Sequence, residues 1–369
     1  MSTVLFLPFM QLGLSYYLSV QSLALLSLLS KFSYRFHFAL IFTVFFSFFL
    51  FFLKYFYEPL TYEDVLRTFR ELFCFSIILL STYGFVKINV DRTVLYLKIF
   101  FVLLSLLICT QYLAISFFNV FPRIPLDFFI MNIGTLVGVE DALYYGSRIR
   151  PIGFYGEPSY AALLVLVSYY LIDKYHRGNS GWYELLMVIS IFLLSSFSGI
   201  FVAVFLLISK YFKLLINLKG FLVFGFFIFL FFIFHSEFLV RITLIIEGSA
   251  DQSAQIRMFN PIVVINSLVS DSYFFGVSGT TLGSYLLVFD DARDNGIFNL
   301  IMDYGFSTLF IILIIFFRLK NLGLFVFFIL LSQFNGDVFS FDKTVIFSLL
   351  FGLAYTINLR YKNEVSSYS

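Results

Sequence analysis

Long apolar stretches recur along this chain, and they limit what it can fold into, because a helix needs about 20 apolar residues to cross the hydrocarbon core of a membrane. Clear stretches cover residues 4–29, 36–56, 69–86, 94–118, 159–173, 220–235, 298–317 and 344–358. Of the 369 residues, 60% are hydrophobic and 12% are charged, whereas soluble domains carry about 25% charge. The pattern therefore predicts an all-α, polytopic integral membrane protein and excludes a water-soluble globule.

Composition also excludes several partners and cofactors. A net charge of +2 gives no basic footprint for phosphate backbones, so no nucleic-acid partner is expected. Cys74 and Cys109 lie inside apolar stretches, and the histidines are far apart in sequence. Neither pattern has the spacing of a zinc site or a disulfide framework. We expect no metal and no cofactor.

Two stretches leave the number of crossings open. Residues 321–334 are read as a short span, and residues 183–212 are either one long helix or two short ones divided at Ser195-Ser196-Phe197-Ser198-Gly199. Lys and Arg accumulate on the cytoplasmic side. A break at Ser195–Gly199 gives eleven crossings with the N-terminus outside, 14 cations and four acids inside, and an acidic outer side. Because the unbroken alternative places Lys210, Lys213 and Lys219 outside, we expect the break.

Two outward loops, about 119–158 and 236–297, are far longer than usual helix connections. Both contain apolar and aromatic residues throughout, so they are expected to be packed. The sequence contains no internal repeat or linker, which predicts a single membrane domain over residues 1–369.

The first outer loop ends in a motif that could carry chemistry. It reads Arg148-Ile-Arg150-Pro-Ile-Gly-Phe-Tyr155-Gly-Glu157-Pro158 directly before a span. Arginine suits phosphate and carboxylate groups, and Pro158 places Glu157 near a helix N-terminus. The alternative interpretation is that the arginines pair with lipid headgroups and Glu157 caps the helix.

The second outer loop contains Arg241, Arg257, a glycine-rich stretch over 276–283 and the acidic run Asp290-Asp291-Ala-Arg-Asp294-Asn295. A turn-rich loop explains the glycines, and solvated surface explains the acids. The acidic run lacks an EF-hand pattern.

In their order, these motifs resemble Wzy-type O-antigen or capsular polysaccharide polymerases and the related O-antigen ligases. The similarity covers about 150–305. It rests on Arg150-x-x-Gly-Phe-x-x-Glu157-Pro158, the Ser/Gly break, Arg257 leading to Phe-Gly-Val-Ser-Gly over 275–279, and Asp294-Asn295 with Gly305. Ligases have histidine where this chain has Asp294, and this departure favours a polymerase.

The resemblance implies a GT-C-like glycosyltransferase with its active face on the periplasmic side of the bacterial inner membrane. Its donor and acceptor would be glycans linked to undecaprenyl pyrophosphate, and a chain-length regulator protein could be a partner. A ligase would instead transfer the glycan to lipid A–core, and a flippase or transporter would only move it. We find neither repeat halves nor midplane charges of the kind that transporters use.

Under this hypothesis, arginines compensate the charge of the pyrophosphate leaving group and a carboxylate accepts the proton of the attacking hydroxyl. Arg150 and Arg257 are expected to bind the pyrophosphate, with Arg148 and Arg241 secondary. Glu157 is the first choice for the general base, or for orienting an arginine, and Asp294 is the second. Tyr155 and Asn295 are further candidates for substrate binding; Tyr155 could stack on a sugar, although an interfacial tyrosine explains it equally well.

Overall fold

The protein is described from a computed structural model that carries side chains. The structure describes residues 3–10, 12–13, 19–32, 38–56, 61–85, 88–118, 120, 130–131, 150–155, 157–215, 259–267, 275–277, 295–334 and 336–366. Within these residues the secondary structure is helical, apart from two antiparallel strands of two residues each, β1 (Leu12–Gly13) and β2 (Ile130–Met131).

The described helices follow one another along the chain with short or undescribed connections between them. In chain order they are the 3-10 helix η1 (Thr3–Phe9), α1 (Val20–Leu29), α2 (Phe38–Phe52), the 3-10 helix η2 (Leu53–Phe56), α3 (Tyr62–Ser81), α4 (Val90–Phe118), α6 (Pro158–Tyr175), α7 (Gly181–Leu194), α8 (Phe197–Leu215), α12 (Asn260–Ser267), α15 (Gly296–Tyr304), α16 (Ser307–Leu319), α17 (Leu322–Leu331) and α18 (Phe341–Ser366).

Two of these helices, α4 and the Phe341–Asn363 part of α18, are long and apolar enough to cross a membrane, and several shorter helices are also apolar. The all-helical class is thus confirmed and agrees with a helical membrane protein. The sequence predicts eleven crossings, whereas only these two of the described helices have the length and hydropathy of a membrane span. The expected span 220–235 and most of the two long loops lie outside the described residues.

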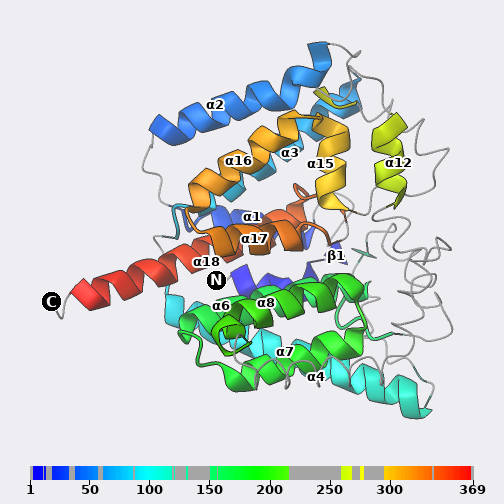
Figure 1. Cartoon of the computed structure of the whole chain (residues 1–369), viewed down its shortest axis with the longest axis vertical. Coiled ribbons are helices and arrows are strands. Elements are labelled where there is room, and N and C mark those ends of the chain that lie inside the picture. The colour runs from blue at the N-terminus through cyan, green and yellow to red at the C-terminus, as the bar shows by residue number, and fades with distance from the viewer. Residues whose placement is uncertain are drawn as a thin grey trace.

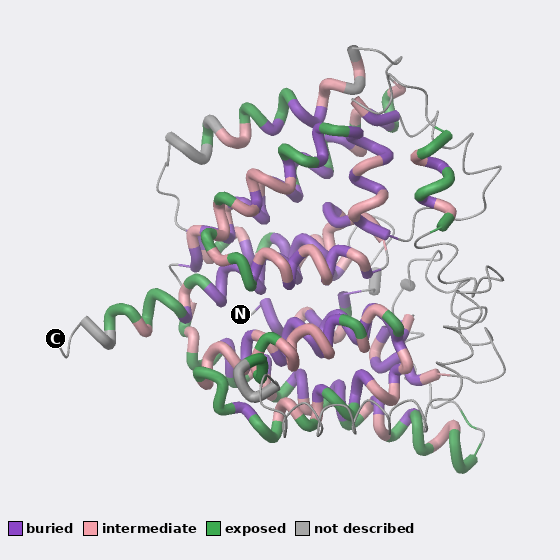
Figure 2. Tube along the Cα trace, viewed as in Figure 1, coloured by how far each residue is buried: buried purple, intermediate pink, exposed green. Residues whose placement is uncertain are grey.

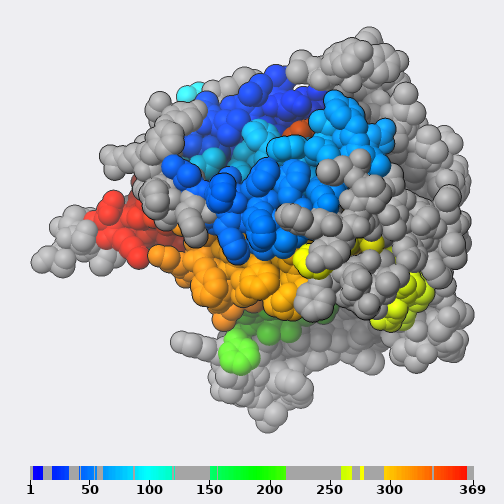
Figure 3. All heavy atoms as spheres, turned by 90° about the horizontal axis from the view of Figure 1, so that it is seen from above, coloured from blue at the N-terminus to red at the C-terminus, as the bar shows by residue number. Residues whose placement is uncertain are grey.

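Most helices run side by side along one direction, whereas α15 and α12 lie across the others at one end of the bundle (Figure 1). We call this the α15 end. The last turns of α18 mark the opposite end, which we call the Arg360 end. Seen from the face that carries α2, the atoms of α2 lie beside those of α16 (Figure 3), in agreement with the packing of these two helices.

The core surrounds α18, which packs on α1, α3 and α6. Buried residues concentrate on these inner helices (Figure 2). The outer face of α4 differs, because it exposes a continuous apolar stripe. Leu95, Ile99, Leu103, Leu106 and Leu113 are each about half exposed. An apolar stripe of this length on the outside of a bundle is typical of contact with lipid.

The break expected at Ser195–Gly199 is confirmed. Helix α7 ends at Leu194, Ser195 adopts the left-handed conformation with φ of 49°, and α8 begins at Phe197. A short serine adopts this conformation more readily than the branched apolar residues around it would. The long stretch therefore forms two separate helices, as the distribution of Lys and Arg predicts.

The prediction of one helical span over residues 4–29 was wrong. The stretch is divided between η1 and α1, and Thr3 Oγ1 lies 3.3 Å from Ser27 Oγ. The start of η1 and the end of α1 therefore lie beside each other near the Arg360 end, and β1, which follows η1, lies toward the α15 end (Figure 1). We call η1 and α1 the two legs of an N-terminal hairpin. The side predicted for the N-terminus changes accordingly: it lies at the same end as Lys31, not opposite to it. One face of the 3-10 leg packs against protein, as buried Val4 and Leu7 show, whereas Leu5 and Phe9 on its other face are each 41% exposed.

The prediction of one span over residues 298–317 was also wrong. Gly305, with φ of 53°, ends α15, and α16 begins at Ser307 in a different direction (Figure 1). Helix α15 lies across the bundle end, and α16 enters the bundle. This change of direction carries Asp303 to the end of the bundle, where it meets α3.

Candidate functional site

The segment before α6 is held in place by one buried amide. Gln111 of α4 accepts hydrogen bonds from the backbone N–H groups of Ile152 and Gly153 at 3.1 and 2.8 Å, and its Nε2 donates to the Gly153 carbonyl at 3.1 Å. Gln111 is 1% exposed. A buried amide with three backbone partners fixes a loop strongly, because each unmade bond would leave a polar group without water.

Helix α6 starts where the sequence predicts. Pro158 occupies the first helical position, and Glu157 stands at the N-cap with extended backbone. The partly exposed Glu157 carboxylate accepts a hydrogen bond from the Ser159 hydroxyl at 2.9 Å. The prediction that Glu157 lies at a helix N-terminus is confirmed.

Arg150 reaches the break between α7 and α8. Its Nη1 lies 3.5 Å from the carbonyl oxygen of Ser195, and the side chain is partly buried. Two motifs separated by 45 residues, the Arg150–Pro158 segment and the Ser/Gly break, therefore meet at one end of the bundle. This is the α15 end, because α6 and α18 run parallel: Tyr361 near the end of α18 donates to the carbonyl of Tyr175 at the end of α6.

Tyr155 and Asn295 take part in packing. Tyr155 is 3% exposed, its hydroxyl donates to the Leu7 carbonyl at 3.0 Å, and its ring lies 5.1 Å from that of Tyr160. Asn295 caps α15 and is also 3% exposed. Its Nδ2 donates to Gln333 at 2.6 Å. Both side chains are thus buried within the fold, away from solvent.

The remaining predicted site residues, Arg148, Arg241, Arg257 and Asp294, lie outside the described residues. The juxtaposition of Arg150 with Arg257, on which the predicted pyrophosphate site depends, therefore stays a prediction.

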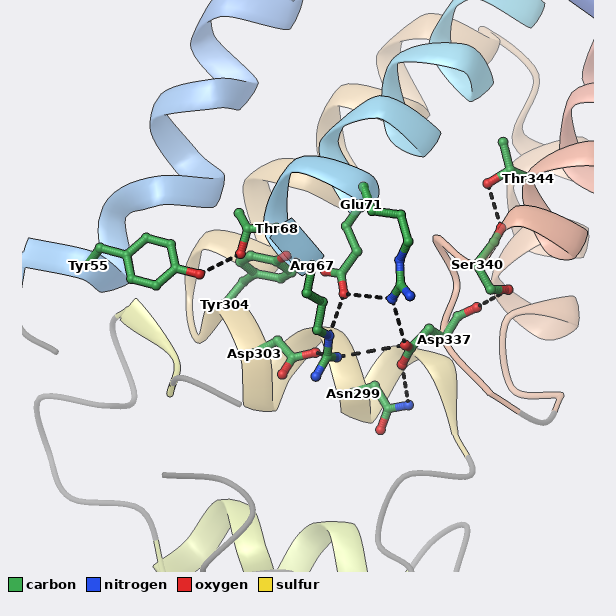
Figure 4. A network of polar contacts seen from close by, with 11 residues as sticks. Tyr55, Arg67, Thr68, Glu71, Asn299, Asp303, Tyr304, Asp337, Ser340 and Thr344 are labelled. Carbon is green, nitrogen blue, oxygen red and sulfur yellow. Dashed lines mark hydrogen bonds and ion pairs between the residues drawn. The ribbon is translucent and has the colours of Figure 1, made fainter. Parts of the chain in front are cut away.

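A second group of charged residues lies at the same end of the bundle (Figure 4). Arg67 of α3 donates from Nε to Glu71 at 2.8 Å and from Nη2 to Asp303 of α15 at 2.5 Å. The Tyr304 hydroxyl donates to the other oxygen of Glu71. Glu71 and Asp303 have side chains only 3% and 4% exposed. We call these four residues the Arg67 network.

The Arg67 network has an exposed edge made by Arg70 and Asp337. Arg70 Nη2 lies 3.8 Å from Asp337 and 3.7 Å from Glu71, and Asn299 donates to Asp337 at 3.0 Å. The side chains of Arg70 and Asp337 are 40% and 28% exposed. With this edge, the group holds two guanidinium groups and three carboxyl groups. Its inner part is packed too tightly to enclose a water molecule.

The Arg67 network was not predicted from the sequence, although the sequence contains two signals of it. Glu71 and Asp303 are lone acids within the apolar stretches 69–86 and 298–317, and an ionisable residue inside such a stretch marks a functional site or needs a buried partner. Arg67 and Glu71 also have the i, i+4 spacing of a helical ion pair. The contact of both with α15 depends on the tertiary fold.

The groups at the α15 end provide hydrogen-bond donors and acceptors. Within the part of the chain that the structure describes, no three His, Cys, Asp or Glu residues are grouped as metal ligands would be. Arg150 and Arg70 offer cationic donors at the α15 end, and Glu157 and Asp337 offer accessible carboxylates. Comparison of the chain with protein-family models, with curated proteins and with solved structures returned no match.

Proposed function

We propose that the protein polymerises undecaprenyl-pyrophosphate-linked oligosaccharide repeat units at the outer face of the bacterial inner membrane. The observation that carries this proposal is the contact between Arg150 and the Ser195 carbonyl. It joins two of the motifs by which the chain resembles such polymerases. The motif over 275–279 also packs near the motif that ends at Gly305: the backbone N–H of Val277 donates to the Met302 carbonyl at 2.9 Å.

The distribution of charge supports an outward-facing site. At the Arg360 end, the described cations greatly outnumber the acids, and they include Arg92, Lys98, Lys174, Lys210, Arg318, Lys320, Arg360 and Lys362. The positive-inside rule makes that end cytoplasmic. The α15 end, with Arg150, Glu157 and the Arg67 network, then faces the periplasm. From α2 onward, we keep the predicted topology, in which successive spans cross the membrane in alternating directions. The N-terminal hairpin enters and leaves the membrane on the cytoplasmic side.

The chemistry is a glycosyl transfer by direct displacement, which needs one base for the acceptor hydroxyl and one cation for the leaving pyrophosphate. An acceptor hydroxyl attacks the anomeric carbon of the donor glycan, and the bond from that carbon to the pyrophosphate oxygen breaks. Glu157 accepts the hydroxyl proton, and undecaprenyl pyrophosphate leaves with its charge compensated by Arg150. Arg257 would add the second guanidinium.

The exposed edge of the Arg67 network, Arg70 and Asp337, would bind the glycan. Arg70 and Asp337 offer donors and acceptors that match sugar hydroxyls, and the buried part of the network holds α3 against α15 beneath them. Because Asn299 donates to Asp337, this carboxylate has a fixed orientation.

Reconstitution of the purified protein with lipid-linked repeat units tests the proposal. Longer lipid-linked glycans, together with released undecaprenyl pyrophosphate, are the expected products. The Glu157→Gln variant should form none at equal protein level. Transfer of the glycan to lipid A–core would make the protein a ligase, and movement across the vesicle without bond formation would make it a flippase; either result would overturn the proposal.

A further inference from the structure

An open groove lies at the Arg360 end of the bundle, away from the site described above. It has a volume of about 860 Å³ and is bounded by the end of α3, the turn between α16 and α17, and the last turns of α18. The lining residues that bear on ligand binding are Tyr83, Phe317, Arg318, Lys320, Leu359 and Lys362.

The groove is strongly cationic. Arg318, Lys320 and Lys362 line it, and no Asp or Glu is found among its described lining residues. The acids whose side chains the structure describes at this end lie elsewhere, beside cations outside the groove. Asp91 pairs with Arg360, and both Asp173 and Glu184 pair with Lys210. The groove therefore presents a positive surface to an external anion.

Arg318 is held at the wall of the groove by hydroxyl groups. It donates to the hydroxyls of Tyr83 and Thr43, each at 2.5 Å. Hydroxyl partners fix the position of the guanidinium and carry no charge of their own. A positioned arginine is the group that suits phosphate best in proteins, because its planar fork matches phosphate oxygens.

Lys320 adopts a backbone conformation that costs free energy. It follows α16 with φ of 50°, in the left-handed region where glycine or asparagine is usual at the end of a helix. The exposed lysine at this position lines the groove at the turn into α17. This conformation ends α16 and places Lys320 at the wall of the groove.

The side of the groove that faces outward is apolar. Phe317 is 67% exposed and Leu359 is 42% exposed, and both lie beside the cations. A ligand that satisfies the whole surface therefore has an anionic head and an apolar tail. Basic pockets between membrane helices on the cytoplasmic side bind lipids of this kind.

We propose that this groove binds an anionic phospholipid of the cytoplasmic leaflet, with the phosphate between Arg318, Lys320 and Lys362 and the acyl chains along Phe317 and Leu359. The inference rests on the membrane class, on the groove and on the orientation that the positive-inside rule gives to the Arg360 end, and it is independent of the proposed glycosyl transfer.

The test measures lipid binding to the purified full-length protein in neutral detergent, by native mass spectrometry and by the shift in Tm. Phosphatidylglycerol is compared with phosphatidylcholine and with inorganic phosphate. Lys320→Gln with Lys362→Gln removes two charges and leaves the hydrogen bonds of Arg318 in place. Lys98→Gln with Lys174→Gln is the matched control, because these lysines lie at the same end but outside the groove.

We expect phosphatidylglycerol to bind and to raise Tm more than phosphatidylcholine. The groove variant should weaken its binding by on the order of ten-fold or more, and the control pair should leave it within about two-fold. Three results would each overturn the proposal: equal binding of the two lipids, unchanged binding in the groove variant, or the full effect produced by inorganic phosphate alone.

Discussion

Arg67 and Asp303 form an ion pair of 2.5 Å between residues 236 positions apart in sequence. The pair connects α3, near the start of the chain, with α15, which lies across the end of the bundle. Glu71 and Tyr304 complete the contact from the same two helices. This connection holds the transverse helix on the bundle, next to the segments that carry the proposed site.

Removing the charge of Arg67 should destabilise the protein far more than removing that of Arg70. Arg67→Met leaves two carboxylates buried without their cation, which costs about 3 kcal/mol or more in comparable buried pairs. Arg70 is 40% exposed and has only long contacts, so Arg70→Met should cost about 1 kcal/mol or less. Thermal unfolding of both variants in detergent measures the difference. Equal losses would show that the Arg67 network does not hold α15 in place.

Gln111→Leu should impair activity although Gln111 does not reach the exposed site. The change removes three hydrogen bonds to the backbone of the Arg150–Glu157 segment, and each buried unmade bond costs about 1–3 kcal/mol. We expect loss of long glycans together with faster proteolysis within residues 150–157. Thr110→Val, at an exposed neighbouring position, is the control and should keep both properties. Normal chain length in Gln111→Leu would refute the positioning role.

Gly276→Ala should disturb the contact between the second loop and α15. Gly276 has φ of 78°, and a Cβ there would lie 2.3 Å from the backbone of Asp303. Gly178 has φ of 84° with open space around it, so Gly178→Ala carries only the backbone strain of about 1 kcal/mol. The Tm of Gly276→Ala should therefore fall well below that of Gly178→Ala. Similar Tm values would mean that the close packing of Gly276 on α15 does not form.

Epitope tags at the two chain termini should be accessible from the same side of the membrane. Thr3 lies beside Ser27 at the Arg360 end, where α18 also finishes. Protease protection of tags in sealed inner-membrane vesicles of known orientation measures this directly. Tags protected on opposite sides would restore a single N-terminal crossing and exclude the hairpin.

Local signals predicted much of the helical framework. A long apolar stretch was sufficient for α4, Pro158 located the start of α6, and the excess of Lys and Arg on one side resolved the break at Ser195. Each of these features depends on residues close together in sequence. The same applies to Glu157, whose place at a helix N-terminus follows from the proline after it.

The features that sequence reasoning missed depend on partners far away in the chain. The stretch 3–29 contains no charged residue, so hydropathy does not distinguish its two legs from one span, and the packing of η1 on α1 and α4 depends on the tertiary fold. Asp303 belongs to an apolar stretch, and the turn at Gly305 carries it to Arg67. The aromatic ring of Tyr155 is of a kind that stacks on sugars, but the side chain packs against η1 and is buried.

In the proposed reaction, Arg150 and Glu157 at the α15 end act on a lipid-linked glycan. The most direct measurement is the length distribution of the surface glycan in cells whose only copy of the protein carries Arg150→Ala, with Arg92→Ala at the opposite end as control. At equal protein level in the membrane, we expect Arg150→Ala to leave single repeat units on the acceptor and Arg92→Ala to give the normal ladder. A full ladder in the Arg150→Ala cells would contradict this role of Arg150.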